Sequence, residues 1–554
     1  MKVIIACLNS KYVHASLSPW CLLAGVREFS KNMYDVTVME STINGDTTSF
    51  ADKIINEKPD VVAFSCYIWN ITKTLEICSI IKRNHRCKIV LGGPEVAYRP
   101  KDILEKYQFA DYVLSGEGEW TFPDFLDNMN GNLSLISGLT YRSDSEIITT
   151  PEKEYAETPP SPYSDEFFEN LDGRISYLET ARGCPYRCAF CLSGRCSPLR
   201  FFDVTRVKKD IIRLSQSGTQ TVKFIDRTFN ANAERANEIL LFIKENYGKE
   251  IPQNVCFHFE IAGDVLKEST LDILSSMPYG LVQLEVGMQS FNEETLRLIN
   301  RKTNTKKLIE NIKKLISFNN MHIHIDLIAG LTGEDSESFK NSFNIAYSLK
   351  AHMLQMGFLK LLHGADMREN KEKYPCIFSD EPPYEVISTP WLSADEIKSL
   401  KNCEDALDRL YNSGRFLFTL EYLTDEIGIL PFDVFNGFGN SVNGNKMRLS
   451  EYAEKLYNFF CDKCDKEVLR EKILCDLLCC SSSVQIPDIL KIKDPLYKQV
   501  KKYFIENVDK NIKVAILYSS NQVFAVNQSE RKNLYNRFCG DYYNLEETEK
   551  GCRK

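Results

Sequence analysis

The sequence predicts an α/β protein with three successive parts: a doubly wound, Rossmann-like domain, a partial (β/α)6 TIM barrel, and a mostly helical C-terminal domain. Short apolar runs alternate with stretches of helical periodicity twice, over residues 3–129 and again over residues 175–358. A proline-rich stretch follows each series, at residues 151–162 and 374–390. We therefore expect domains at residues 1–140, 173–390 and 391–554, with a linker at residues 141–172.

The first domain is predicted to form a parallel sheet covered by helices. Its strands are expected at residues 3–8, 34–39, 61–65, 87–91 and 112–114. Its helices are expected at residues 19–29, 50–57, 72–81, 100–107 and 120–129. In such a sheet ligands bind beyond the carboxyl ends of the strands. The candidate binding segments are therefore residues 8–14, 65–70, 92–95 and 115–119.

The second domain repeats the alternation and fits a partial barrel, with chemistry at the carboxyl ends of its strands. Strands are expected at residues 175–180, 221–225, 255–261, 281–286, 322–328 and 353–358. Helices are expected at residues 205–216, 231–247, 269–276, 293–299, 305–318 and 335–349. Ser393 and Glu396 form a capping-box pattern that opens a mostly helical tail, with one further strand expected at residues 514–518.

Composition narrows the class of protein. The 554 residues carry 68 basic and 76 acidic side chains, a net charge of −8, which argues against a general nucleic-acid-coating protein but leaves room for a local basic patch. No run approaches 18 apolar residues, so we expect no membrane span. Residues 1–8 are too short for a signal-peptide core and are predicted as a buried strand.

The cysteine content is the first pointer to chemistry. The chain has 19 cysteines, an odd number at irregular spacing, so a disulfide framework is not expected. Reduced thiols or metal ligands in a cytoplasmic protein fit this count better.

Three of these cysteines form a C-x3-C-x2-C motif just after the strand expected at residues 175–180: Cys184, Cys188 and Cys191. Structural zinc and [4Fe–4S] clusters both normally take four protein ligands. Three thiolates on a cluster leave one iron open, where a substrate or cofactor can coordinate. Cys196 is a candidate fourth ligand, so a zinc site stays open as the alternative.

With Phe190 directly before Cys191, the motif resembles the signature of radical S-adenosylmethionine (SAM) enzymes. The resemblance implies a [4Fe–4S] cluster whose open iron binds the amino and carboxyl groups of SAM. One electron then cleaves the sulfonium and releases a 5′-deoxyadenosyl radical, in an oxygen-sensitive, anaerobic enzyme.

Other segments resemble the SAM-binding segments of this family, in the same order. Asp226, Arg227 and Thr228 stand where the family grips the methionyl amino group, and Glu260 stands where a ribose hydroxyl is held. The segment with Gly287, Gln289 and Ser290 resembles the border of SAM after the fourth strand, and Gly330 lies in the segment near the adenine. Taken singly, an acidic residue at a strand end is as readily a helix cap as a ligand.

The first domain resembles a cobalamin-binding domain placed ahead of a radical SAM core, in a subgroup with a C-terminal domain of unknown function. The resemblance rests on residues 65–67, 92–95 and 116–119. It implies cobalamin contacts from Ser65, Tyr67, Trp69, Gly92, Gly93, Glu95, Gly116 and Glu117. The alternative is that the two glycines merely make a turn.

One departure from the cobalamin pattern concerns the cobalt ligand. The D-x-H-x-x-G loop that supplies a histidine in the wider family is absent after the first strand, where residues 9–14 read NSKYVH. This implies cobalt without the usual histidine, and we expect His14 to be structural or to face the substrate.

Several residues remain outside these motifs. A second group of thiols is a candidate zinc or auxiliary iron–sulfur site, or simply a set of small buried side chains: Cys461, Cys464, Cys475, Cys479 and Cys480. His322 and His324 occupy alternate positions of one strand and so face the same side. Lys223 and Tyr177 join Tyr67, Trp69 and Arg227 as candidate pocket-lining residues.

We therefore expect a cobalamin-dependent radical SAM enzyme that methylates an unactivated carbon, with its methyl group taken from cobalamin and resupplied by SAM. A small-molecule substrate is favoured, with an electron donor such as flavodoxin or ferredoxin and no membrane partner. The acidic balance disfavours a nucleic-acid partner but leaves one open. The alternatives are a cobalamin-binding radical SAM enzyme that rearranges, cyclises or reduces its substrate without methylation, and a zinc-stabilised, non-catalytic protein.

Overall fold

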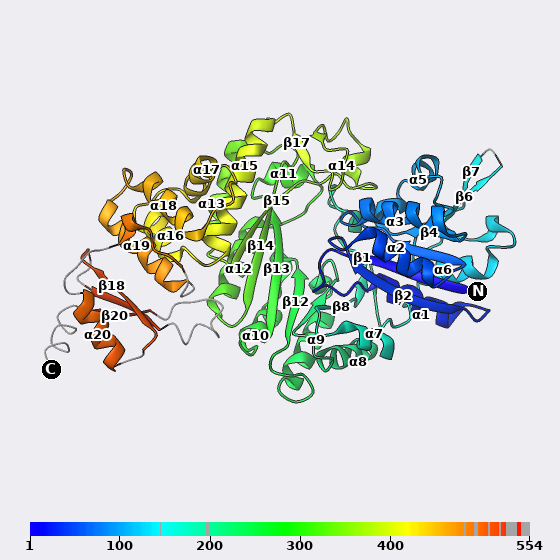
Figure 1. Ribbon diagram of the computed structural model, residues 1–554, viewed down its shortest axis with the longest axis horizontal. Helices are drawn as coiled ribbons and strands as arrows, with labels where there is room; N and C mark the ends of the chain where they lie inside the picture. Colours follow the sequence, from blue (N-terminus) through cyan, green and yellow to red (C-terminus); the bar gives the residue numbers. More distant parts are fainter. Residues whose placement is uncertain are drawn as a thin grey trace. The chain divides into compact units, whose positions relative to one another are not determined.

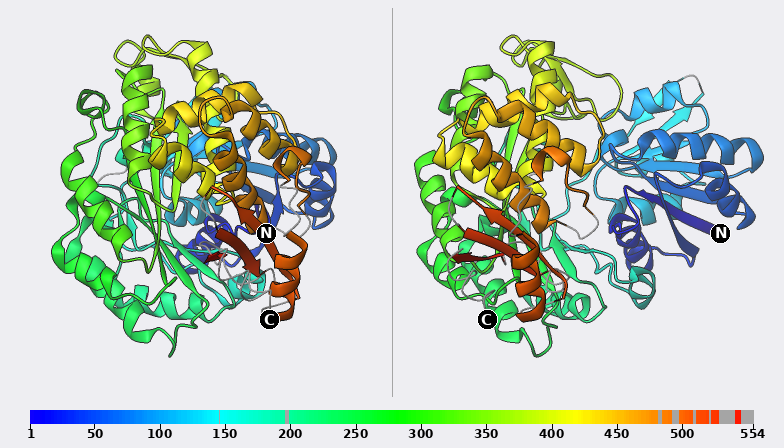
Figure 2. Two further views of the ribbon diagram at one scale, coloured as in Figure 1. Left: turned by 90° about the vertical axis from the view of Figure 1, so that its left-hand side faces the viewer. Right: turned by 60° about the vertical axis from the view of Figure 1, so that its left-hand side comes forward.

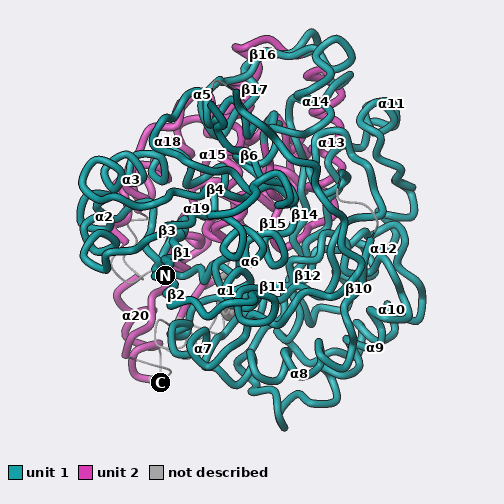
Figure 3. The backbone as a smooth tube through the Cα atoms, turned by 90° about the vertical axis from the view of Figure 1, so that its right-hand side faces the viewer, with its two compact units in different colours: residues 1–334, 358–391 teal, residues 335–357, 392–554 magenta. Residues whose placement is uncertain are grey.

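The computed structural model describes residues 1–144, 146–195, 199–480, 484–491, 497–507, 510–519, 522–527 and 540–544. These residues form two compact units, shown in different colours in Figure 3. Unit 1 comprises residues 1–334 and 358–391, and unit 2 comprises residues 335–357 and 392–554. The first two expected domains both contribute to unit 1.

The first sheet of unit 1 has seven strands in the order β2-β1-β3-β4-β5-β6-β7 (Figure 1). Its parallel strands are β1 (Lys2–Asn9), β2 (Asp35–Thr42), β3 (Val61–Ser65), β4 (Lys88–Gly92) and β5 (Tyr112–Leu114). Its helices are α1 (Ser18–Phe29), α2 (Thr47–Asn56), α3 (Ile71–Asn84), α4 (Pro94–Ala97), α5 (Pro100–Lys106) and α6 (Gly118–Asn128). The strand order reverses between β1 and β3, the switch point at which doubly wound sheets bind ligands.

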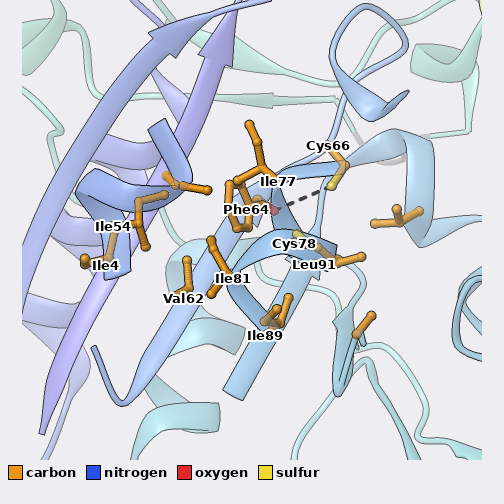
Figure 4. Packing of buried hydrophobic residues seen from close by; sticks show 14 of the residues in the cluster. Ile4, Ile54, Val62, Phe64, Cys66, Ile77, Cys78, Ile81, Ile89 and Leu91 are labelled. Carbon is orange, nitrogen blue, oxygen red and sulfur yellow. Dashed lines mark hydrogen bonds between the residues drawn. The ribbon is translucent and has the colours of Figure 1, made fainter. Parts of the chain in front are cut away.

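A continuous apolar core holds the helices to this sheet. Ile4, Val62 and Phe64 of the central strands pack against Ile54 of α2 and Ile77 of α3, as Figure 4 shows. All five side chains are at most 5% exposed. Burial on both faces explains why these strands read as unbroken apolar runs in the sequence.

Two antiparallel strands, β6 (Leu139–Ser143) and β7 (Glu146–Thr149), extend the first sheet beyond β5. The sequence pattern predicted no strand over this stretch. The strands are short, and β7 lies at the sheet edge with an incompletely buried face, so the apolar signal is weak there.

The second sheet of unit 1 carries the barrel strands β14-β13-β12-β11-β8, in that order. Its strands are β8 (Ser176–Leu178), β11 (Thr221–Phe224), β12 (Cys256–Ile261), β13 (Val282–Gln289) and β14 (His322–Ala329). The helices around it are α7 (Asp165–Leu171), α8 (Val204–Ser215), α9 (Ala233–Asn246), α10 (Glu268–Ser275), α11 (Glu293–Leu298) and α12 (Thr305–Ser317). The neighbouring strands pair in parallel, so their carboxyl ends share one edge.

Small elements complete unit 1. They are β9 (Ala181–Arg182), β10 (Arg200–Phe201), α14 (Asp366–Glu369), β16 (Ile377–Phe378) and β17 (Val386–Ser388). The 3₁₀ segments are η1 (Leu133–Leu135), η2 (Leu192–Gly194), η3 (Phe229–Ala231) and η4 (Gly263–Val265). The loop between β9 and β10 carries the C-x3-C-x2-C motif.

Unit 2 is mainly helical. Its helices are α13 (Ser336–Ser348), α15 (Ala394–Leu407), α16 (Leu417–Glu421), α17 (Pro431–Val442), α18 (Leu449–Phe460), α19 (Lys466–Cys479) and α20 (Tyr497–Asn507), with shorter segments η5 (Asp408–Asn412), η6 (Tyr422–Glu426) and η7 (Asp488–Leu490). All but the last residue of β15 (Met353–Phe358) belong to this unit. The capping box at Ser393 and Glu396 is formed as predicted.

Unit 2 also contains an antiparallel sheet that the sequence pattern predicted only in part. Its strands are β18 (Ile512–Leu517), β19 (Gln522–Asn527) and β20 (Gly540–Asn544), drawn in red tones in Figure 2. Phe504 of α20 packs with Val514, Ile516 and Val523 of this sheet. The fold class is confirmed, with this small sheet as an addition to the helical part.

A bilayer-crossing helix would need a long apolar run. Within the part of the chain that the structure describes, no helix has both the length and the apolarity for this.

Candidate functional site

The three motif cysteines lie around one small cavity of unit 1. Cys184, Cys188 and Cys191 line a cavity of about 180 Å³ beyond the carboxyl ends of the barrel strands. The other lining residues are Tyr186, Phe190, Gly194, Arg227, Thr228, Glu260, Ile261, Ala262, Glu285, Gly287, Gln289, Arg301 and Asp326. The structure thus brings together the thiols and six other predicted SAM-site residues: Phe190, Arg227, Thr228, Glu260, Gly287 and Gln289.

Arg301, which no sequence motif indicated, lies beside the thiol of Cys188. Its Nη1 donates to Sγ of Cys188 at 3.6 Å, and its Nη2 donates to the carbonyl of Gly287 at 2.5 Å. Burial raises the pKa of the Cys188 thiol, and the nearby guanidinium opposes that rise. A fixed cation beside a cysteine favours its thiolate, which is the form that binds metal.

Hydrogen bonds fix the cysteine loop itself. The Ala189 amide donates to the Ile299 carbonyl at 2.9 Å, and the Cys191 amide donates to the Cys188 carbonyl at 3.0 Å. The Cys184 thiol lies 3.4 Å from Oγ1 of Thr228. The loop therefore has a defined path that keeps its thiols on the cavity.

The thiols do not converge on one point. Among the described residues, no three His, Cys, Asp or Glu side chains are placed to hold a single metal ion. A structural zinc ion needs four ligands that converge at about 2.0–2.3 Å. In a [4Fe–4S] cluster each thiolate binds a different iron. Cys196, the candidate fourth zinc ligand, lies outside the described residues.

Charged side chains from β11, β12 and β13 interact beside the cysteine cavity. Nζ of Lys223 lies 3.3 Å from Oε2 of Glu285, and Nε2 of His258 lies 2.9 Å from the same oxygen. Burial opposes ionisation of Glu285, but His258 and Lys223 outweigh burial and lower its pKa to about 2. Burial raises the pKa of Glu260, although Arg227 opposes the rise. Two neighbouring carboxylates thus differ in proton affinity.

The two histidines of β14, His322 and His324, differ in their surroundings. Nε2 of His324 lies 3.0 Å from Oδ1 of Asp326, which lines the cysteine cavity. Burial lowers the pKa of His324, but Asp326 reverses this and leaves it raised. His322 does not line either cavity.

A second, larger cavity of about 600 Å³ lies beyond the carboxyl ends of the first sheet. Ser65, Tyr67, Trp69, Gly92, Gly93 and Gly116 line it, as expected from the sequence. Lys223, Tyr177 and His14 line it as well. These positions follow β3, β4 and β5 around the switch point of the sheet.

Gly93 shows why this cavity needs glycine. Its φ is +99°, and a Cβ at this position would lie 2.6 Å from the carbonyl oxygen of Cys66. Any other residue would be strained and would displace backbone. Glycine is therefore required where the loop after β4 packs directly on the backbone of Cys66, beside the cavity.

Aromatic side chains define part of the same cavity. The rings of Tyr67 and Trp69 stack with centroids 4.5 Å apart, and Trp69 is 47% exposed. Nδ1 of His14 lies 2.6 Å from the hydroxyl of Tyr177. This contact supports the structural interpretation of His14.

The two cavities share a wall. Arg227 and Glu260 line both of them, and Nη1 of Arg227 lies 3.9 Å from Oε2 of Glu260. A molecule in the cysteine cavity and a molecule in the larger cavity would thus meet the same two side chains. This shared wall is the central geometric feature of the site.

Three predicted SAM contacts lie outside both cavities. Asp226 is 2% exposed, and its carboxylate accepts from the amides of Thr180 and Ala181 at 2.7 and 3.0 Å. Ser290 donates to Oε1 of Glu334 at 2.5 Å. Gly330 has a φ of +87° and packs against Val386. These residues shape the loops, because their polar groups or backbone are already engaged by the protein.

Two predicted cobalamin contacts also lie outside the larger cavity. Glu95 is 4% exposed and pairs with Arg99, whose Nη2 lies 2.7 Å from its Oε1. Glu117 pairs with Arg182 and with Arg200. Both carboxylates are therefore engaged in ion pairs with arginines, and Glu117 is only partly buried.

The second group of thiols forms no metal site among the residues described. Cys475 is 1% exposed and packs in an apolar cluster with Leu474 and Leu478. Cys461 and Cys464 donate to the backbone carbonyls of Asn458 and Phe460. These contacts favour the interpretation of small buried or capping side chains.

Three stretches of the chain match known families. Residues 3–126 match the B12 binding domain, and residues 178–346 match the radical SAM superfamily. The chain therefore carries a B12-binding region followed by a radical SAM region. Residues 372–553 match a protein of unknown function, DUF4080. The radical SAM match implies a [4Fe–4S] cluster and SAM, and the B12 match implies cobalamin.

Curated relatives of this chain include methyltransferases. The 2-(S-pantetheinyl)-carbapenam-3-carboxylate methyltransferase of Streptantibioticus cattleyicolor is 27% identical over 322 residues, which cover 51% of this chain and 44% of that protein. The cobalamin-dependent radical SAM methyltransferase TokK of Streptomyces tokunonensis is 27% identical over 314 residues, which cover 52% and 45%. The chain spans about half the length of these curated relatives.

A solved structure shares the fold. The cobalamin-dependent SAM radical enzyme OxsB, with aqua-cobalamin and SAM bound, matches with a TM-score of 0.59 at 15% identity. The match covers 86% of this chain and 78% of that one.

Proposed function

We propose that this protein is a cobalamin-dependent radical SAM enzyme that transfers a methyl group to an unactivated carbon of a small molecule. The observation that carries the proposal is the wall that Arg227 and Glu260 share. It joins a cavity with three motif cysteines to a cavity at the switch point of the B12-binding domain.

The cysteine cavity has the donor set for a cluster with an open iron. In the proposal Cys184, Cys188 and Cys191 hold three irons, and Arg301 stabilises the negative charge at Cys188. SAM would lie against Phe190, Thr228, Gly287 and Gln289, which line the same cavity. Glu260 would accept from a ribose hydroxyl.

The larger cavity has the open backbone that a corrinoid needs. Ser65, Gly92, Gly93 and Gly116 would border cobalamin, because all four line this cavity. The stacked pair Tyr67 and Trp69 offers an apolar face. No D-x-H-x-x-G histidine follows β1, and His14 is engaged by Tyr177. We therefore propose cobalt without a histidine ligand from this loop.

When bound, the cluster and SAM supply a 5′-deoxyadenosyl radical and cobalamin supplies a methyl group. The protein itself supplies placement. Arg227 and Glu260 border both compartments, so a substrate carbon held at this wall would be within reach of both. Lys223 and the ionised Glu285 form an ion pair beside these residues.

The partners follow from this chemistry. We propose a small-molecule substrate. Radical SAM enzymes need a reductant, and we propose that flavodoxin or ferredoxin serves here. We also propose a cytoplasmic location, because the described cysteines are free thiols and a reducing compartment keeps them so.

The test is anaerobic purification with iron, sulfide and hydroxocobalamin, followed by an absorption spectrum and an assay for 5′-deoxyadenosine with SAM and dithionite. We expect about four irons per chain, bound cobalamin and 5′-deoxyadenosine release. A protein with one tetrahedral zinc and no 5′-deoxyadenosine would refute the proposal.

A non-methylating reaction is the second candidate, and anaerobic magnesium-protoporphyrin IX monomethyl ester cyclases are among the relatives. Methyl-labelled SAM separates the two without knowledge of the substrate. A methyltransferase moves the label onto the bound corrinoid, whereas a cyclase or reductase leaves the corrinoid unlabelled.

A further inference from the structure

A set of lysines without ion-pair partners follows the cysteine loop on the surface of unit 1. Lys302 lies just before α12, and Lys306 and Lys307 lie in the first turn of this helix; all three are exposed. Among the residues that the structure describes, no carboxylate pairs with any of them. We name Lys302, Lys306 and Lys307 the lysine surface.

The lysine surface borders an open groove of about 620 Å³ between α10 and α12, which lie side by side in Figure 3. Lys267, Lys306, Lys307 and Lys314 line the groove, together with Glu268 and Glu310. Lys267 pairs with Glu234 and Lys314 pairs with Glu268, so Lys306 and Lys307 carry the unpaired positive charge. The whole chain has a net charge of −8, whereas the unpaired Lys306 and Lys307 leave this groove with a positive balance. Such a face attracts acidic macromolecules and accelerates their encounter.

The lysine surface is tied directly to the cysteine cavity. The Ile299 carbonyl accepts from the amide of Ala189, which is the neighbour of Cys188, and Arg301 contacts Sγ of Cys188 at 3.6 Å. Lys306 follows Arg301 by five residues, so their Cα atoms lie within about 18 Å of each other. Arg187, also next to Cys188, is exposed and adds a further positive charge.

We propose that the lysine surface docks a small acidic electron-carrier protein that reduces the cluster. This inference rests on the proposed function, because it requires a cluster on the three cysteines. One electron leaves the flavin or iron–sulfur centre of the reduced carrier and enters the cluster, with no bond made or broken. The carrier is thereby oxidised by one electron and the cluster reduced by one.

The position of the surface favours a carrier over a nucleic acid. The lysines lie on the segment that holds the cysteine loop, while the larger cavity opens elsewhere in unit 1. The groove is lined by no aromatic side chain on which a base could stack.

The test uses the reconstituted full chain and a purified flavodoxin in its fully reduced state. The variant is K306E/K307E, and the matched control is K101E/K249E, which changes the net charge equally at exposed lysines elsewhere. Glutamates in the first turn of α12 also suit the helix dipole, so the variant should fold. The rate of cluster reduction is followed by stopped-flow absorbance at low and high ionic strength, with flavodoxin and separately with dithionite.

We expect K306E/K307E to slow reduction by flavodoxin about tenfold or more at low ionic strength, with the difference shrinking at high ionic strength. The control variant and the dithionite rates should stay within about twofold of wild type. Equal rates for K306E/K307E and wild type, or equal slowing in both variants, overturn the proposal. Loss of RNA-oligonucleotide binding with an unchanged flavodoxin rate also overturns it.

A failure of the proposed function looks different. In that case dithionite produces no cluster signal in the wild type. Docking is then read from binding of oxidised flavodoxin, which K306E/K307E should weaken about tenfold and K101E/K249E should not.

Discussion

Nη2 of Arg182 lies 2.8 Å from Oε1 of Glu119, in an ion pair that joins β9 to the first turn of α6. The same guanidinium contacts Glu117 and Glu179. Burial lowers the pKa of Arg182, but the surrounding carboxylates outweigh burial and raise it. Within unit 1, this network fastens the loop after the B12-binding sheet to the strand that precedes the cysteines.

We expect Arg182→Met to lower the free energy of unfolding by about 3–5 kcal/mol, because Glu119 would remain buried without its partner. Urea unfolding at neutral pH measures the change. Arg297→Met is the control, since Arg297 pairs with Glu294 on the surface and should cost at most about 1 kcal/mol. If both substitutions lower the free energy of unfolding by the same small amount, the Arg182 network does not contribute the expected stabilisation.

Substitution of any motif cysteine should remove the cluster. In Cys184→Ala, Cys188→Ala and Cys191→Ala, iron after anaerobic reconstitution should fall from about four atoms per chain to below about one. Cys376→Ala is the control, because this half-buried thiol lies outside the cysteine cavity. Iron and sulfide analysis, with the absorption spectrum, gives the result. Full iron content in all three motif variants would contradict the cluster assignment.

Gly93→Ala should abolish cobalamin binding, because the new Cβ would meet the carbonyl of Cys66 at 2.6 Å and displace the loop that borders the larger cavity. The measurement is the corrinoid absorbance retained after desalting. Gly280→Ala is a matched control, since Gly280 also has a positive φ, +75°, but no atom lies within 4 Å of the position that a Cβ would take there. If Gly93→Ala retains cobalamin, Gly93 is not required for corrinoid binding.

The buried carboxyl group of Asp226 should make the free energy of unfolding depend on pH. Burial raises its pKa to about 6, although hydrogen bonds from Thr180 and Ala181 oppose the rise. An unfolded aspartate has a pKa near 3.9, so the folded state binds the proton more tightly. The resulting stabilisation is fully present below about pH 4 and is lost as the pH rises through about 6, a change of about 3 kcal/mol.

Asp226→Asn should remove this dependence while it keeps an acceptor for the amides of Thr180 and Ala181. Urea unfolding of the cofactor-free chain from pH 4.5 to 7.5 should show wild type losing stability relative to the variant. Asp272→Asn, at an exposed position of α10, should leave the pH profile of wild type in place. Parallel profiles for wild type and Asp226→Asn would refute the assignment.

The strands and loops around the site were readable from the sequence because their signals are local. The apolar runs of β3 and β14, and the glycines after β4, follow directly from burial and from backbone conformation. The C-x3-C-x2-C motif likewise depends only on spacing.

Side-chain partners were less predictable because they depend on distant segments. Asp226 is engaged by Thr180, 46 positions earlier, and Glu117 by Arg200, 83 positions later. Arg301 reaches Cys188 across 113 positions. No local pattern records these encounters, so the sequence located the loops but could not tell a ligand-facing carboxylate from one enclosed by the protein.

The wall formed by Arg227 and Glu260 has a consequence for redesign. Since either side chain borders two compartments, replacing it perturbs both at once, and selectivity for one occupant cannot be adjusted there in isolation. Independent adjustment has to use positions that border a single compartment, such as Trp69 for the larger one or Gln289 for the smaller.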